Sequence, residues 1–405
     1  MAPPPPPLPL PLSSPSRDPL TNMPTLTYPP STPLSKLSPT ELTSLHSLLT
    51  ELARLHSTAD PAINPLDLFL LLSSDHPDAS LLKFLRARSY SAPNGLKQML
   101  QTLAWRRQVG ILELSGQGES GVLLDCPEIL YGSTPDPPVG YIWGQDALHR
   151  PVVWIVLKSW EPKRIPREVL QKHLLVFFEE LKGMAGWPVE GAMIVMDING
   201  FSLTKHMDMQ FYKFFMEITQ SHFPESLGRC LIYGSSYQTR IFNVLFSLLS
   251  PMIDARVKSK IGFVSKKEEL GREFEGGLES AWISARYGGM SGREYVYEAP
   301  PAEDLTITDA ANAKFAKGRQ EEEARAHQLL TKWFDLTNTW IKTSKSGTAT
   351  EEEVMRAWRE REDVGCEMRE CWRRFMGCVK EGRKGLWERR GVLGGDGSVD
   401  WAKAL

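Results

Sequence analysis

Cysteine is scarce in this chain, and its few cysteines form no recognisable framework. They stand at Cys126, Cys230, Cys366, Cys371 and Cys378. An odd number at such wide spacing argues against structural disulfides and is typical of a reducing compartment. The last three lie close together, but neither a CxxC pair nor a histidine stands among them. We interpret them as thiols on helices rather than as zinc ligands, and we expect no metal site.

Long apolar runs and a strong excess of either charge are also missing. No stretch of 18 or more apolar residues occurs, so the sequence predicts no membrane-spanning helix. The formal net charge is -2, which excludes the global basic field typical of nucleic-acid-binding proteins. Residues 3–7 are all proline, where a signal peptide would carry basic residues and then an apolar helix. We therefore expect a cytoplasmic protein without a nucleic-acid partner.

The usual signatures of catalysis are absent as well. The sequence contains no GxSxG nucleophile elbow and no GxxxxGK[ST] phosphate loop, and its eight histidines are scattered. One GxGxxG string occurs at Gly116, Gly118 and Gly121, but no core strand precedes it and Pro127 would stop a long helix after it. We interpret this string as a flexible loop. The sequence therefore predicts neither an enzyme nor a cofactor.

Proline and apolar periodicity divide the chain into four parts. Residues 1–37 hold 13 of the 30 prolines, which predicts a disordered tail that is partly polyproline II. Ser38, Pro39 and Glu41 form a helix-start signature, and leucines follow at helical spacing. We expect a helical N-terminal subdomain over residues 38–120, a main domain over 121–297 and a helical extension over 298–405.

The main domain alternates between two kinds of segment. Short β-rich runs are predicted at residues 140–143, 151–157, 192–198, 230–233 and 260–264. Long helical stretches lie between several of them, at residues 168–184 and 206–220. This alternation indicates an α/β fold with a mixed, mostly parallel sheet. The tryptophans of the extension, five from Trp333 to Trp387, are expected to pack it onto the main body or a partner.

One predicted helix, at residues 238–253, is apolar nearly all the way round. Two interpretations stand side by side: a buried core helix, and a movable flap that covers a lipid and enters a bilayer when open. The residues alone favour the core helix, and Pro251 is expected to end or kink it. The apolar positions that we single out are Ile241, Phe242, Leu245, Phe246, Leu249 and Met252.

Charged residues near three predicted turns allow two interpretations each. Arg88 ends an apolar helix, where basic side chains usually extend into water, although an arginine can also bind phosphate by two parallel hydrogen bonds. Glu225 stands before a turn glycine, where a carboxylate is ordinarily a cap or an ion-pair partner. If the fold brings it near Arg88 and Lys260, it can instead accept hydrogen bonds from sugar hydroxyls.

Six short motifs resemble, in order, those of a known family. They are FLRAR at 84–88, WRR at 105–107, HRPV at 149–152, MDINGFS at 196–202, FPESLG at 223–228 and VKSKI at 257–261. Together they resemble the CRAL-TRIO fold of fungal phosphatidylinositol-transfer proteins, over about residues 75–290. The resemblance implies a sheet flanked by helices that enclose an apolar lipid pocket. It also implies that Arg88, Glu225 and Lys260 grip the lipid headgroup, although a family threonine is Val257 here.

The same resemblance narrows the expected ligand. Family members that bind phosphatidylcholine use polar groups at positions that are Ala192, Ile194, Ile142 and Val153 here. We therefore expect a monomer that binds phosphatidylinositol, binds phosphatidylcholine poorly, and exchanges its lipid for a sterol or squalene-like one. It would meet membranes transiently, at the endoplasmic reticulum, endosome or lipid droplet. A lipid sensor or regulatory scaffold that never delivers its lipid is the alternative.

Overall fold

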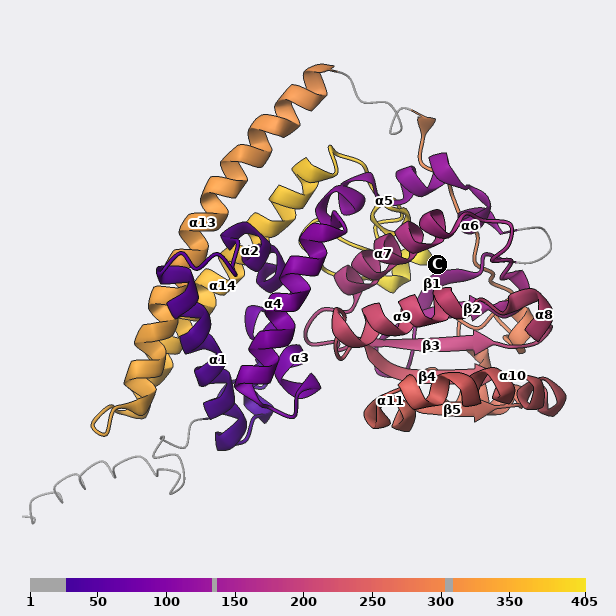
Figure 1. The fold of residues 1–405 in the computed structure, drawn as a ribbon, viewed down its shortest axis with the longest axis horizontal. Coiled ribbons are helices and arrows are strands. Elements are labelled where there is room, and N and C mark those ends of the chain that lie inside the picture. Colours follow the sequence, from indigo (N-terminus) through magenta and orange to yellow (C-terminus); the bar gives the residue numbers. More distant parts are fainter. Residues whose placement is uncertain (1–26, 133–136, 303–308) are drawn as a thin grey trace, which may run out of the picture.

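The computed structural model describes residues 27–132, 137–302 and 309–405, which form a helical unit and an α/β body side by side (Figure 1). The helical unit begins with α1 (Pro39–Ser57), α2 (Pro65–Ser73), α3 (Pro77–Ala87) and α4 (Ala92–Gln108). Each of the four starts with a proline in its first turn, where no backbone N–H is needed. The capping box between Ser38 and Glu41 is present, which confirms the predicted start of α1.

The α/β body is built on one five-stranded sheet with the order β1-β2-β3-β4-β5. Its strands are β1 (Gly140–Gln145), β2 (Pro151–Val156), β3 (Ala192–Asp197), β4 (Leu227–Tyr233) and β5 (Ile261–Val264). The first pair is antiparallel and the other three pairs are parallel. The mixed, mostly parallel sheet that the sequence predicted is therefore confirmed.

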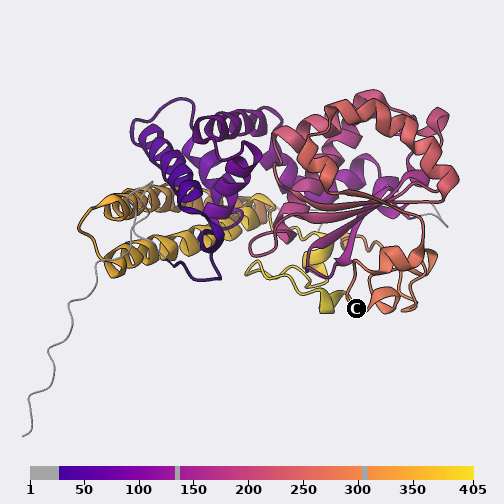
Figure 2. The ribbon, with the colours of Figure 1, turned by 90° about the horizontal axis from the view of Figure 1, so that it is seen from below.

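Helices and loops cover both faces of the sheet (Figure 2). One face carries α9 (Met209–Ser221) and α10 (Ser236–Leu249), while the segment after β5 and the C-terminal end lie on the other. The body also contains α7 (Arg167–Met184), α8 (Leu203–His206), α11 (Ala255–Ser259) and α12 (Lys267–Gly271). This arrangement places α10 and α11 next to the edge of the sheet that β4 and β5 form, the last two strands in the order.

The C-terminal helices complete the helical unit instead of standing apart from it. Two long helices, α13 (Asp309–Lys345) and α14 (Glu351–Val379), form a hairpin that shares one hydrophobic core with α1–α4. Trp333, Trp340 and Trp358 are buried in that core. Beyond α14, α15 (Leu386–Arg389) and a 3-10 turn at Trp401–Ala404 pack under the sheet. The extension, which we expected to pack onto the main body or a partner, thus contributes to the cores of both bodies.

Two local predictions were wrong. We expected residues 27–37 to belong to a disordered tail, but Tyr28 is buried with its ring 5.5 Å from that of Trp358. Pro33 and Leu34 of the same segment are buried as well, and residues 1–26 lie outside the described residues. We also expected a flexible loop at Gly116–Gly121, but it lies in α5 (Ile111–Asp125), kinked at Gly118 (φ 53°). A short α6 (Glu128–Tyr131) follows directly after Pro127.

Candidate functional site

The apolar helix at residues 238–253 is a covering helix with two different faces. Ser235 caps the N-terminus of α10, and a 3-10 turn replaces the helix at Ser250–Met252, around Pro251 as predicted. Toward the sheet, Phe242 and Leu245 are buried. We call residues 236–259, which comprise α10, this turn and α11, the gate segment.

The six predicted gate residues do not all face inward. Ile241, Phe246 and Leu249 are half-buried against the cluster that contains Phe242 and Leu245. Met252, by contrast, is exposed. It shares this exposure with other large apolar side chains of the same segment, namely Tyr237, Val244 and Leu248. A soluble core helix would not present such a row of apolar side chains to water, so the outer face is suited to an apolar surface.

The sheet presents a continuous row of apolar residues, of which Ile194, Cys230 and Ile261 lie beneath the gate segment. Strand register places Ile142, Val153, Ile194, Cys230 and Ile261 opposite one another across all five strands. Burial raises the pKa of the Cys230 thiol to about 12, so this side chain is a neutral group in apolar surroundings. Ala192, the other predicted pocket residue, is buried at the start of β3.

Several central side chains on this face are incompletely buried. Ile155, Ile194 and Met196 belong to the middle strands, yet each is only half-buried, although α9 and α10 cover the same face. Central strands covered by helices are normally packed to near completeness. The protein's own side chains therefore do not fill the space beside these three residues.

Glu225 and Lys260, two of the three residues that the family resemblance implied, meet beside the gate segment. The Lys260 ammonium lies 3.3 Å from a Glu225 carboxylate oxygen and donates a 2.7 Å hydrogen bond to the carbonyl of Leu227. Glu225 has a backbone φ of 55°, an unusual value for a residue with a side chain. Such strained positions cluster at binding sites. Both side chains are half-buried, so the pair remains reachable by a ligand.

Arg88 lies nearby but does not join that pair. It is the exposed C-cap residue of α3, and in the described part of the chain no hydrogen bond or ion pair holds its guanidinium. Hydrogen bonds from Arg256, and then the charges of Arg256 and Arg88, lower the pKa of Asp254 against the effect of burial. Arg88 therefore lies at the edge of the site, and its guanidinium N–H groups have no hydrogen-bond partner among the described residues.

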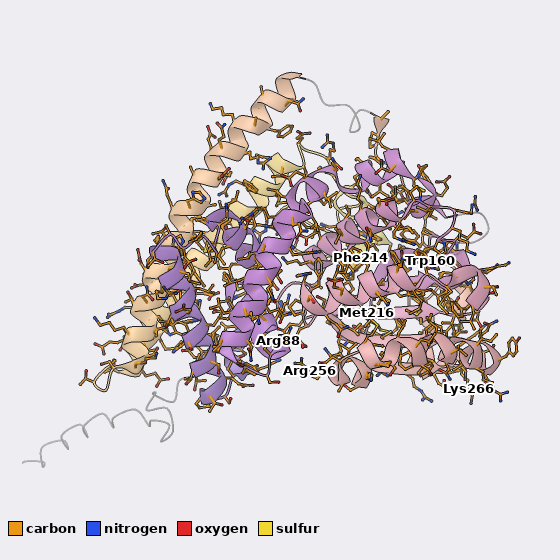
Figure 3. All side chains as sticks on the ribbon, in the orientation of Figure 1. Arg88, Trp160, Phe214, Met216, Arg256 and Lys266 are labelled. Atoms are coloured by element: carbon orange, nitrogen blue, oxygen red, sulfur yellow. The ribbon has the colours of Figure 1, made fainter. Side chains whose placement is uncertain are left out.

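Arg256, which the sequence analysis did not single out as a site residue, connects these groups. Its guanidinium donates hydrogen bonds to the carbonyls of Arg86 and Ala87, the latter at 2.7 Å, and lies 3.6 Å from Glu225. Figure 3 shows Arg88 and Arg256 at the junction between the helical unit and α11. The signal available in the sequence was the Asp254-x-Arg256 helix start, which does not reveal a contact with α3.

Two other groupings bear on function. His76, Asp78 and Glu362 approach one another closely enough to hold a metal ion. However, the His76 ring bonds Glu362 at 2.7 Å and Asp78 pairs with both terminal nitrogens of Arg361, so these groups serve as partners for one another.

A cavity of about 1000 Å³ lies elsewhere, between α5, α7 and α14, and not beneath the gate segment.

Comparison with known proteins identifies the α/β body. A sequence model of the CRAL/TRIO domain matches residues 138–289. The chain is 25% identical over 345 residues to a CRAL-TRIO domain-containing protein of Schizosaccharomyces pombe, covering 82% of this chain and 86% of that protein. It is 24% identical over 326 residues to the phosphatidylinositol transfer protein CSR1 of Eremothecium gossypii, covering 80% and 70%.

Among solved structures, the crystal structure of Sfh5 matches with a TM-score of 0.43 and 14% identity, covering 66% of this chain and 92% of that one. Residues 138–289 form a CRAL-TRIO domain, and the resemblance that the sequence motifs suggested is confirmed. The chain is a relative of fungal CRAL-TRIO proteins, a lipid-binding and lipid-transfer family that includes phosphatidylinositol transfer proteins. Of the described helices, none is both long and apolar enough to cross a bilayer.

Proposed function

We propose that this protein binds a single lipid, phosphatidylinositol, between the gate segment and the sheet and transfers it between membranes. The observation that carries the proposal is the half-buried apolar face at Ile155, Ile194 and Met196 under α10. Acyl chains would complete the burial of these side chains at about 25 cal/mol for each Å² removed from water. The relatives that are named as phosphatidylinositol transfer proteins support the choice of lipid.

The headgroup would lie at the end of this face, between Lys260 and Arg88. Lysine and arginine neutralise a phosphate, while the Glu225 carboxylate accepts hydrogen bonds from inositol hydroxyls. The existing 3.3 Å contact between Glu225 and Lys260 keeps both groups oriented before a ligand arrives. Arg88 has no competing ion pair among the described residues, so its guanidinium is available to the phosphate.

A second ligand, exchanged for the first, would be apolar. Ile142, Val153 and Ile194 form an unbroken apolar row across three strands, and no hydroxyl on that row can hold a choline headgroup. A sterol or a squalene-like hydrocarbon fits such a surface better than phosphatidylcholine does. The exposed apolar side chains of the gate segment, Val244 and Leu248, would enter the surface of a membrane during exchange.

A transfer assay between donor and acceptor vesicles tests the proposal. We expect the wild-type protein to move labelled phosphatidylinositol and to move phosphatidylcholine poorly. The double variant Glu225→Ala/Lys260→Ala should lose phosphatidylinositol transfer while it keeps its circular dichroism spectrum and thermal midpoint. Glu217→Ala/Lys213→Ala, a charge-matched change on α9, is the control and should transfer normally.

The result decides between a carrier and the alternative of a sensor. Native mass spectrometry of the purified protein names the lipid that it carries. Tight binding of phosphatidylinositol without any vesicle-to-vesicle transfer would favour a sensor or scaffold. Undiminished transfer by the Glu225/Lys260 double variant would refute the headgroup site.

A further inference from the structure

The cavity between α5, α7 and α14 is separate from the proposed lipid site. Its volume is about 1000 Å³, at the upper end of the range typical of small-molecule sites. The cavity is lined by residues 115–120 of α5, by Glu179, Glu180 and Gly183 of α7 and by the last turns of α14, together with Gly394, Gly395, Gly397 and Ser398. Figure 2 shows that this last part of the chain crosses from the helical unit to the underside of the sheet. Ligand sites favour such junctions between structural units.

Most of the carboxylates that line the cavity are already neutralised by a partner. These ion pairs join Asp75 to Lys83, Glu119 to Arg389, Glu179 to Arg106 and Glu388 to Lys380. Glu180 has no such partner among the described residues, but burial and then the neighbouring Glu119 raise its pKa to about 8. Its carboxyl group is therefore largely protonated at neutral pH and can donate a hydrogen bond. Asp400, which is exposed, caps the final turn of the chain.

Two of the basic residues that line the cavity, by contrast, have no acidic partner among the described residues. Arg369 and Arg373 are half-buried on one face of α14, and neither forms an ion pair or hydrogen bond within the described ranges. They stand one helical turn apart, where like charges repel. Burial, and then the charge of Arg369, lower the pKa of Arg373, while the carboxylates of Asp396 and Glu370 oppose this shift. The cavity wall thus carries two guanidinium groups that no ion pair among the described residues neutralises.

The rest of the wall suits a ring that bears polar groups. Trp187 and Trp372 supply flat apolar surfaces, and Ser115 and Ser120 supply hydroxyls. A Cβ atom added to Gly397 would come within 2.8 Å of the Arg373 Nε, so the glycine backbone lies directly against that guanidinium. Indole rings stack on sugars and bases, while paired arginines recognise phosphate oxygens. A phosphate monoester carries nearly two negative charges at pH 7, which matches two arginines better than a single carboxylate does.

We propose that this cavity binds a phosphate monoester on a sugar ring, with Arg369 and Arg373 as the phosphate ligands. The GxGxxG string at Gly116–Gly121 would form part of its wall, although it does not form a dinucleotide-binding turn. Two sources share this chemistry, namely simple sugar phosphates and mononucleotides. The site is independent of the lipid function proposed above, because its phosphate-binding residues contact neither the gate segment nor the Glu225–Lys260 pair.

Calorimetric titration of the full chain with adenosine monophosphate, ribose 5-phosphate and inorganic phosphate tests this proposal. Similar affinity for the two organic phosphates would support a sugar-phosphate site, and preference for adenosine monophosphate would support a nucleotide site. Arg369→Gln/Arg373→Gln should weaken binding by roughly tenfold or more. The control Arg356→Gln/Arg359→Gln removes the same charge from an exposed face of α14 and should bind like the wild type.

A second variant fills the cavity without touching its charges. Nothing lies within 4 Å of a Cβ built on Gly183, which lines the cavity on α7. Gly183→Leu should therefore abolish binding while the thermal midpoint stays the same or rises, because leucine favours helix more than glycine does. Gly347→Leu, at an equally open glycine in the α13–α14 connection, is its control. If neither organic phosphate binds, or if both cavity variants bind with unchanged affinity, the proposal is wrong.

The same variants separate this proposal from the lipid function. Arg369→Gln/Arg373→Gln should transfer phosphatidylinositol at the wild-type rate, and Glu225→Ala/Lys260→Ala should bind the organic phosphates normally. Failure of lipid transfer in the wild-type protein would therefore leave the cavity proposal standing, and failure of phosphate binding would leave the lipid proposal standing.

Discussion

At the scale of single residues, Glu225 shows how a binding role can conflict with backbone stability. A side chain at a φ of 55° costs about 1 kcal/mol or more relative to glycine. A carboxylate nevertheless occupies this position, 3.3 Å from Lys260. Strained backbone of this kind is found at binding sites, where the surrounding structure holds it in place. Gly228 lies three residues later, already within β4, so it does not take over this backbone conformation.

This conflict predicts that replacing Glu225 by glycine relieves the backbone strain but abolishes lipid transfer. Glu225→Gly should be more stable than Glu225→Ala by about 1 kcal/mol, because alanine keeps the strain and glycine relieves it. Both variants should lose phosphatidylinositol transfer, since both lack the carboxylate. Urea unfolding of the two variants measures the difference. Equal stabilities would show that the left-handed backbone at this position is not strained in solution.

His46 offers a second prediction, about pH. Its ring is fully buried, both ring nitrogens lack a hydrogen-bond partner, and Trp340 packs against it with ring centres 4.5 Å apart. Burial lowers the pKa of His46 to about 3. The unfolded chain binds a proton at His46 below about pH 6.5, while the folded chain does not, so stability is lost as the pH falls toward 3.

The expected loss at His46 between pH 7 and pH 5 is about 2 kcal/mol. His46→Leu should remove this part of the pH dependence, because leucine cannot bind the proton in either state. Urea unfolding at both pH values measures it. A His46→Leu variant whose stability falls with pH as steeply as the wild type would contradict the assignment.

At the scale of elements, Arg256 joins the gate segment to the helical unit. It donates hydrogen bonds to two carbonyls at the C-terminus of α3, where backbone acceptors lack partners inside the helix. A positive charge there also offsets the negative end of the helix dipole, which would otherwise repel a phosphate near Arg88. On the other side, Gln220 of α9 donates a 2.9 Å hydrogen bond to the carbonyl of Met252. The gate segment is thus held at two polar points.

Removing one of these points should loosen the gate segment. We expect Arg256→Ala to increase amide hydrogen exchange in residues 236–259 by several-fold, with no change in the sheet. Arg256→Lys keeps the charge but cannot reach both carbonyls with the same geometry, so it should restore exchange only partly. Lys258→Ala, an exposed cation on the same short helix, serves as the control. Unchanged exchange in Arg256→Ala would show that the apolar contacts of Phe242 and Leu245 hold the segment alone.

The helices and strands could largely be predicted from the sequence, whereas the contacts between them could not. The apolar spacing in α1, the five β-rich runs and the stop at Pro251 all depend on residues close together in the chain. The Glu225–Lys260 contact was expected only through a family resemblance, and the contact of Arg256 with α3 was not expected at all. Both join segments far apart in sequence, and local periodicity carries no information about such packing. The kinked helix at Gly118 was missed because glycines weaken any helical pattern.

At the scale of the whole molecule, one buried ion pair joins the N-terminal helices to the C-terminal hairpin. Arg361 of α14 is 1% exposed and bonds both oxygens of Asp78 on α3, at 2.8 and 2.6 Å. It also donates to Thr337 of α13 at 2.7 Å, and its guanidinium lies 4.3 Å from the ring centre of Trp333. Burial alone would raise the pKa of Asp78, but the charge and hydrogen bonds of Arg361 hold it below its usual value.

Breaking this pair should therefore unfold more than the C-terminal hairpin. Arg361→Met leaves the Asp78 carboxylate buried without a partner, which costs about 3–5 kcal/mol, and adding Asp78→Asn should recover part of that loss. Because α13 and α14 share their core with α1–α4, we expect the thermal unfolding of the whole helical unit to move to lower temperature as one transition. Limited proteolysis of Arg361→Met should then cut within α1–α4 as readily as within α13. Cleavage confined to α13 and α14, with α1–α4 still protected, would show that the hairpin unfolds separately from α1–α4.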